Sequence, residues 1–103
     1  MSYYEGRRTK MGAIVTVDGE TLDPRLDLRN HSPTGFEWGF CGSGPAQLAL
    51  AILADHCDNM DEALEFYQRF KWAVIAELPR LNWTLNTRQI DEAIERIREQ
   101  ETR

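Results

Sequence analysis

The residues best suited to chemistry gather in one glycine-rich segment, residues 30–47. An imidazole and a hydroxyl stand side by side there (His31 and Ser32), and the carboxylate of Glu37 follows. Histidine, serine and a carboxylate are the groups that nucleophilic catalysis uses. The glycine pattern that presents a nucleophilic serine is absent, however, and serine followed by proline is also typical of a turn. A small hydrolase using His31 remains one hypothesis, and it requires a second acid or base within hydrogen-bond reach of the imidazole.

A second hypothesis is an anion site where this segment enters an apolar helix. Residues 42–45 read Gly-Ser-Gly-Pro, and proline fits the first turn of a helix because its missing N–H is not needed there. Free backbone N–H groups and the helix dipole would face a bound anion, and Arg25 or Arg29 would pair with its charge. The lysine and hydroxyl residue of a phosphate-binding loop are absent. The same glycines also suit a plain turn into a buried helix.

A third hypothesis is a surface for a protein partner. Phe36, Trp38 and Phe40 alternate like one face of a strand, and aromatic side chains anchor many protein interfaces. Packing in the core is the alternative interpretation of these aromatics. We expect Phe36, Glu37 and Trp38 to face outward together with Arg29 and His31. The full set predicted to bind a partner or ligand is Arg29, His31, Ser32, Phe36, Glu37, Trp38, Ser43 and Gln47.

The cysteines and histidines do not predict a metal site. A zinc site would need all four of them, His31, Cys41, His56 and Cys57, and their spacing matches no common zinc pattern. The N-terminus lacks the apolar stretch of an export signal, so we expect reduced thiols in the cytoplasm. Cys57 has the setting of a packing residue at a helix end. We therefore expect no metal and no cofactor.

The charge balance excludes one class of partner. The formal net charge is -5, and the whole excess lies in residues 31–103, which carry twelve acidic and seven basic side chains. Nonspecific nucleic-acid binding depends on neutralising phosphates, so nucleic acid is not an expected partner. No apolar run is long enough to span a membrane. A homodimer is compatible with the sequence.

The N-terminal third has the pattern of a small antiparallel sheet. The β-branched run 13–17 precedes Asp18 and Gly19, a pair typical of a tight hairpin turn. Residues 3–5 are expected to add a strand. Residues 25–29 alternate strictly between charged residues and leucine, which predicts another strand with its two leucines facing the core.

The rest of the chain predicts three helices and a short edge strand over 83–85. Residues 46–54 are apolar except for one glutamine, so this helix should be buried on all sides. A second helix should begin after Asn59, capped with Glu62, and end at Pro79. A third should follow Asn86, with Gln89 completing its capping box. The predicted fold is therefore α+β, a single domain of residues 1–103 in which a three- or four-stranded sheet packs against three helices.

Three phrases resemble a family of small prokaryotic and phage proteins known only as a domain of unknown function. They are NHSPTGFEWG from Asn30, GSGPAQLALAIL from Gly42 and FKWAVIAELP from Phe70. The resemblance implies single small domains, often carried by phages or other mobile elements, without an assigned activity or cofactor. Position 41 is commonly glycine in that pattern, so Cys41 is not expected to be a nucleophile.

We therefore expect a non-enzymatic interaction module of phage or mobile-element type. It would bind a host or phage protein through the 30–47 loop. The alternative is the binding or sequestration of a small anionic ligand at the glycine-rich helix N-terminus, and a small hydrolase is the third hypothesis.

Overall fold

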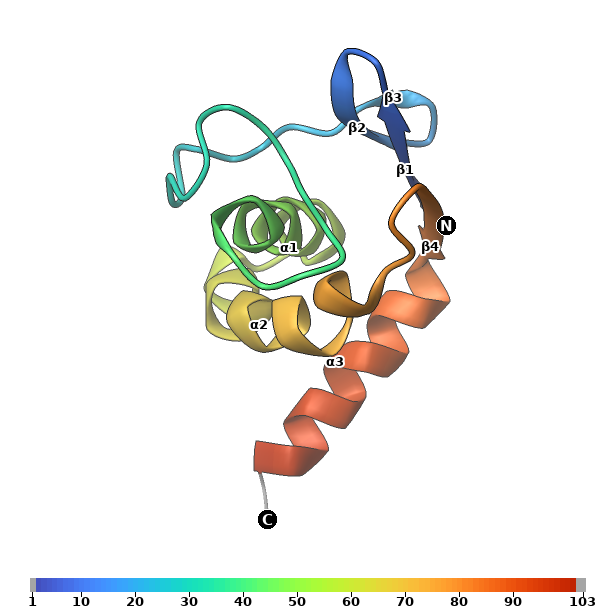
Figure 1. The fold of residues 1–103 in the computed structure, drawn as a ribbon. Coiled ribbons are helices and arrows are strands. Elements are labelled where there is room, and N and C mark those ends of the chain that lie inside the picture. The colour runs from blue at the N-terminus through green and yellow to red at the C-terminus, as the bar shows by residue number, and fades with distance from the viewer. Residues whose placement is uncertain (1, 102–103) are drawn as a thin grey trace.

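The computed structural model describes residues 2–101, which form one antiparallel sheet and three helices (Figure 1). The sheet has the order β3-β2-β1-β4 and consists of β1 (Tyr3–Thr9), β2 (Gly12–Val17), β3 (Glu20–Thr21) and β4 (Asn82–Asn86). The helices are α1 (Ser43–His56), α2 (Met60–Ala73) and α3 (Thr87–Glu101), with a short 3-10 turn, η1 (Ile75–Glu77), after α2. The predicted α+β class is confirmed.

The hairpin of β2 and β3 is the one that the sequence predicts. Asp18 and Gly19 adopt φ angles of 51° and 86°, the left-handed conformation that a tight two-residue turn requires. The Leu22 amide then donates to the Val15 carbonyl at 3.1 Å, which extends the pairing by one residue beyond β3. Val15 and Leu22 are both buried and place this hairpin against the core.

The strand predicted over 83–85 is confirmed as β4, which pairs with β1 at the edge of the sheet. Gly6 of β1 lies directly opposite Trp83. A Cβ atom on Gly6 would lie 2.2 Å from the indole, so only glycine leaves room for the Trp83 ring at this position. The sheet therefore turns one face, which includes Tyr4 and Trp83, toward the helices.

Helix α1 occupies the centre of the molecule. Its residues from Pro45 to Ala54 are all buried, as the apolar run predicts. In Figure 1, α2 lies beneath α1 and the long segment between β3 and α1 passes over it. Helix α3 packs against α2 and β4. Among residues 2–101, no helix is long and apolar enough to cross a membrane.

The start of α2 forms half of its predicted capping box. The Asn59 side chain accepts a hydrogen bond from the Asp61 amide at 2.8 Å. Glu62 pairs instead with Arg98 of α3, at 2.8 Å, so a contact between helices replaces the local one. Helix α2 ends at Ala73, and the η1 turn separates it from the proline that was expected to end it.

The start of α3 matches its prediction in full. The Asn86 amide donates to Gln89 Oε1 and the Gln89 amide donates to Asn86 Oδ1, both at 2.9 Å. Farther along, the guanidinium groups of Arg69 and Arg98 both lie 5.2 Å from the ring centroid of Phe66. These cation–π contacts, one of them from α3, help to hold α3 on α2.

The strand predicted over 25–29 is wrong, because these residues form a turn. The Arg25 amide donates to the Asp23 side chain at 2.9 Å, and Arg25 adopts a left-handed φ of 55°. The Leu28 amide donates a hydrogen bond to the Arg25 carbonyl at 3.0 Å, so local hydrogen bonds replace pairing with another strand. Only Leu28 packs against the core, while Leu26 is exposed.

Candidate functional site

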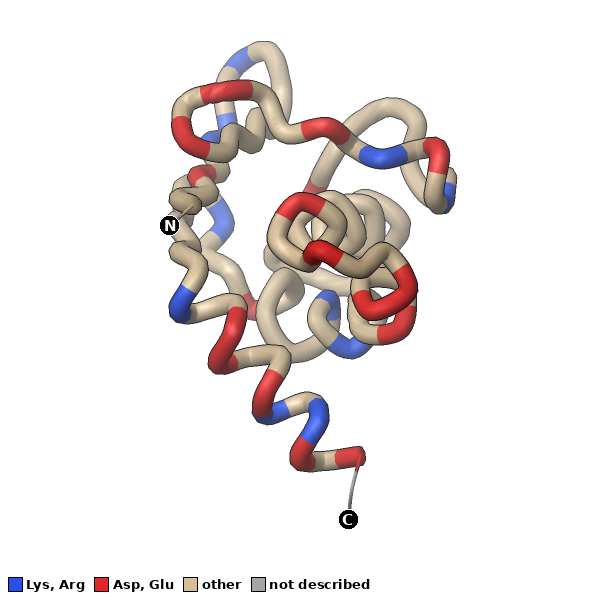
Figure 2. Tube along the Cα trace, turned by 180° about the vertical axis from the view of Figure 1, so that it is seen from behind, with Lys and Arg blue, Asp and Glu red and all other residues tan. Residues whose placement is uncertain are grey.

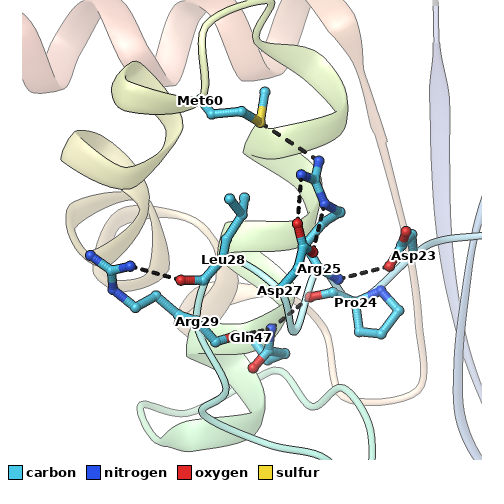
Figure 3. A network of polar contacts seen from close by, with 8 residues as sticks. All are labelled: Asp23, Pro24, Arg25, Asp27, Leu28, Arg29, Gln47 and Met60. Atoms are coloured by element: carbon cyan, nitrogen blue, oxygen red, sulfur yellow. Dashed lines mark hydrogen bonds and ion pairs between the residues drawn. The ribbon is translucent and has the colours of Figure 1, made fainter.

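The predicted binding segment is fastened to α1 by one buried side chain, Gln47. Its Oε1 accepts hydrogen bonds from the amides of His31 (2.8 Å) and Ser32 (3.1 Å). Its Nε2 donates to the carbonyls of Pro24 (2.6 Å) and Arg29 (3.0 Å), as Figure 3 shows. Both acceptor sites and both N–H donors of the amide are used, so these contacts give Gln47 a structural role. Its role in binding stays a prediction.

The structure gives His31 a hydrogen-bond partner on α2. His31 Nε2 lies 2.7 Å from the hydroxyl of Tyr67 on α2, and the two rings are in contact. Tyr67 is almost fully buried. The neighbouring Ser32 hydroxyl donates to the Gly35 carbonyl at 2.7 Å, which is a turn interaction. The imidazole thus stabilises the packing of the segment on α2, and Ser32 is not oriented as its nucleophile.

The arginines expected to complete an anion site lie elsewhere. Arg25 pairs with Asp27 through two hydrogen bonds of 3.0 and 3.1 Å and reaches Met60 at the start of α2 (Figure 3). Arg29 Nη1 donates to the carbonyl of its neighbour Leu28 at 2.7 Å. Among residues 2–101, neither guanidinium forms a hydrogen bond or an ion pair with the first turn of α1, where exposed Ser43 lies.

A separate cleft of about 410 Å³ lies between the end of α1, the start of α2 and α3. His56 Nε2 and Asp91 Oδ1 approach to 2.6 Å across it. Burial and the nearby Glu62 raise the pKa of the Cys57 thiol to about 11. Within residues 2–101, no three His, Cys, Asp or Glu side chains are placed to hold a metal ion. The sequence did not single out this cleft, because its residues come from three elements.

Trp38 was expected to face outward, and this is wrong. It is 1% exposed and is one of the largest fully buried side chains of the protein. Its indole N–H donates to the Arg80 carbonyl at 2.8 Å, and its ring meets that of Trp83 edge-on, with centroids 5.6 Å apart. Hydrophobic burial and a satisfied N–H together hold Trp38 in the core.

The other two aromatics of the segment differ from Trp38. Phe36 is partly buried against the core, whereas Phe40 is 51% exposed. Gly39 adopts a φ of 84°, so the backbone turns between Trp38 and Phe40 and the strand-like alternation does not continue. The Gly39 amide donates to the Ile75 carbonyl at 3.0 Å, which ties this turn to η1.

The exposed ring of Phe40 stands beside a cavity of about 420 Å³, which we call the Phe40 groove. Trp38 contributes to it from the core, and Leu78 contributes an apolar wall from the segment after η1. The complete lining consists of Arg8, Glu37, Trp38, Gly39, Phe40, Leu78 and Arg80.

Arg8 of β1 is held in the Phe40 groove by contacts on several sides. Its Nη atoms lie 2.9 and 3.1 Å from the two carboxylate oxygens of Glu37. Its Nε donates to the Arg80 carbonyl at 3.1 Å, and its guanidinium carbon lies 4.7 Å from the ring centroid of Trp38. The sequence analysis missed Arg8. The available signal was strand alternation, which puts Arg8 on the same face as Tyr4 and the buried core.

Glu37 is held from a second side. It lies against the first turn of α1, where a Cβ atom on Gly44 would come within 2.7 Å of the Glu37 Cβ. Glu37 is therefore a fixed part of the groove wall, and its role in binding stays a prediction.

Comparison with known proteins identifies the family. A family model described as a family of unknown function, DUF6166, matches residues 4–96. The chain belongs to the DUF6166 family. No curated protein and no solved structure matches this DUF6166 chain. All residues that line the Phe40 groove lie within the matched range.

Proposed function

We propose that this DUF6166 protein is a non-enzymatic protein-binding module and that the Phe40 groove is its contact surface. The observation that supports this most directly is an aromatic ring, 51% exposed, beside a cavity in which Arg8, Glu37 and Trp38 are held by hydrogen bonds and packing. Aromatic side chains next to pockets dominate binding energy at protein interfaces. A surface that is already rigid loses little conformational entropy when a partner binds.

The surroundings of the groove support the same function. Six large hydrophobic side chains within residues 2–101 are notably exposed, and three of them come from segments that meet here. These are Phe40, Trp72 at the end of α2 and Leu81 after the groove. The hydrogen bond from Gly39 to Ile75 brings the first two segments together. Several exposed apolar residues in neighbouring segments favour an interaction surface.

The proposed setting is the cytoplasm of a prokaryotic host, where the module of a phage or other mobile element would act by occupying a host protein. This setting rests on the family resemblance of the three sequence phrases and on the two cysteines, which are both free thiols.

A photo-crosslinking amino acid placed at position 40 tests the contact surface in living host cells. We expect one discrete protein adduct after illumination, because a ring in an interface lies within reach of its partner. The control is the same amino acid at position 26, where Leu26 is also exposed but belongs to the 25–29 turn. The same adducts at both positions, or none at position 40, would contradict the proposal.

A further inference from the structure

We propose, resting on the proposed function, that the Phe40 groove accepts a peptide segment in which a carboxylate stands next to a bulky apolar side chain. The carboxylate would be bound by Arg80 and Arg8, and the apolar side chain would pack on Phe40 and Leu78. The carboxylate could come from an Asp or Glu side chain or from a chain terminus. Both sources offer the same planar group to a guanidinium.

Arg80 supplies the unsatisfied charge. Its side chain is exposed at the groove, and it has no hydrogen-bond or ion-pair partner among residues 2–101. Only its backbone carbonyl is engaged, by Trp38 and by Arg8. The backbone at Arg80 is thus fixed while its guanidinium remains open to a ligand.

Arg8 supplies a second, pre-oriented donor group. A guanidinium has five N–H donors, and the contacts with Glu37 and the Arg80 carbonyl account for three of them. Two N–H groups, one on each Nη, therefore remain. Stacking on Trp38 and the ion pair with Glu37 hold the group in place, so binding costs little side-chain entropy.

The local charge balance selects an acidic rather than a basic segment. The groove holds two guanidinium groups against one carboxylate, although the whole protein has a formal net charge of -5. Figure 2 shows acidic residues gathered where α1 leads into α2. This stretch of the sequence contains Asp55, Asp58 and Asp61. An acidic peptide is thus repelled by the protein as a whole and attracted at the groove. This difference would confine it to one place.

Apolar contact completes the recognition. Phe40 and Leu78 line the groove from two segments that are far apart in the sequence. Each side chain is partly uncovered beside the two arginines. A bulky side chain next to the bound carboxylate would cover both. Charge or apolar contact alone would discriminate poorly, whereas their combination requires both features at adjacent positions of the peptide.

Selection from a displayed library of random linear peptides, followed by titration of the selected peptide, tests the proposal. Wild-type protein should enrich sequences that pair an acidic group with a bulky apolar residue. The fluorescein-labelled consensus peptide should bind R80E at least tenfold more weakly, and F40A similarly. The matched control is R7E, because Arg7 is an exposed arginine on the opposite face of β1, and it should change the dissociation constant less than twofold.

Two modified peptides identify the source of the carboxylate. Amidation of the peptide's C-terminus should abolish binding if the groove recognises the terminal carboxylate. Asp→Asn or Glu→Gln in the consensus peptide should abolish binding if the groove recognises a side-chain carboxylate. Enrichment of peptides without an acidic group, equal losses for R80E and R7E, or no enrichment at all would overturn this inference. A crosslinked partner at position 40 would still leave the protein-binding function standing, so the two failures are distinguishable.

Discussion

The Cys57 thiol shows how its surroundings set the chemistry of a single residue. It is partly buried at the end of α1, and its sulfur lies 4.0 Å from a carboxylate oxygen of Glu62. Burial and this negative charge disfavour the thiolate and raise the pKa to about 11. A thiol that stays protonated at neutral pH is a poor nucleophile and a poor metal ligand. Cys57 is therefore a packing residue, as its position in the sequence indicates.

This shift predicts a pH dependence of stability. In the unfolded chain the thiol ionises near pH 8.5–9, but in the folded protein only near 11. The folded state holds the proton more tightly, so its contribution is intact below about pH 9 and is lost as the pH rises toward 11. Urea unfolding between pH 8 and 11 should show a smaller decline for Cys57→Ala than for wild type. Cys41→Ala is the control, and equal slopes in all three proteins would refute the assignment.

At the scale of elements, the long connection between β3 and α1 is ordered by its contacts with the helices. Gln47 holds it from α1, the Tyr67 hydroxyl meets His31 from α2, and Trp38 inserts into the core. Backbone groups in a long connection need partners when they are shielded from water. The single polar residue in the apolar stretch of α1 supplies them.

Replacing Gln47 with leucine should release this connection. The change removes the partners of two amides and two carbonyls, because it replaces the polar side chain with an apolar one of similar size. We expect the free energy of unfolding to fall by roughly 2–4 kcal/mol, because buried polar groups lose their hydrogen bonds. Hydrogen exchange at the His31 and Ser32 amides should also accelerate. The exposed Gln68→Leu is the control, expected to stay within about 0.5 kcal/mol of wild type.

At the scale of the whole molecule, one hydrogen bond joins the central strand of the sheet to the central helix. The Tyr4 hydroxyl on β1 donates to Asp55 Oδ2 on α1 at 2.5 Å, across 51 positions of sequence. Tyr4 is fully buried, and burial together with Asp55 strongly raises its pKa. The bond satisfies a hydroxyl that would otherwise be stranded in the core and fixes the two layers relative to each other.

Tyr4→Phe should therefore weaken the whole fold. Loss of a hydrogen bond to a charged group costs roughly 1.5–3 kcal/mol, measured as the free energy of unfolding at pH 7. In wild type this advantage should disappear as the pH rises past about 10, where the unfolded tyrosine ionises and the folded one does not. Tyr3→Phe is the matched control, since Tyr3 is 49% exposed on the other face of β1. A stability equal to that of the control would rule out this role.

Much of the fold could be predicted from the sequence because the deciding interactions are local. The Asp18-Gly19 turn, the Asn86-Gln89 capping box and the buried run of α1 each depend on residues a few positions apart. The error at 25–29 has the same origin. Its alternation is typical of a strand. The Asp23 side chain, however, accepts a hydrogen bond from the Arg25 amide, so this amide is bound in a local turn instead of pairing with a strand.

Only the tertiary structure decided which residues form the candidate site. Arg8 meets Glu37 across 29 positions and Trp38 meets the Arg80 carbonyl across 42. Sequence patterns identify an aromatic or a charged residue as important, but the direction of its side chain depends on which distant segment supplies its partner. For this reason the sequence singled out the 30–47 segment and its aromatics as candidates. The burial of Trp38, the exposure of Phe40 and the two arginines beside it emerged only when the sheet and helices packed together.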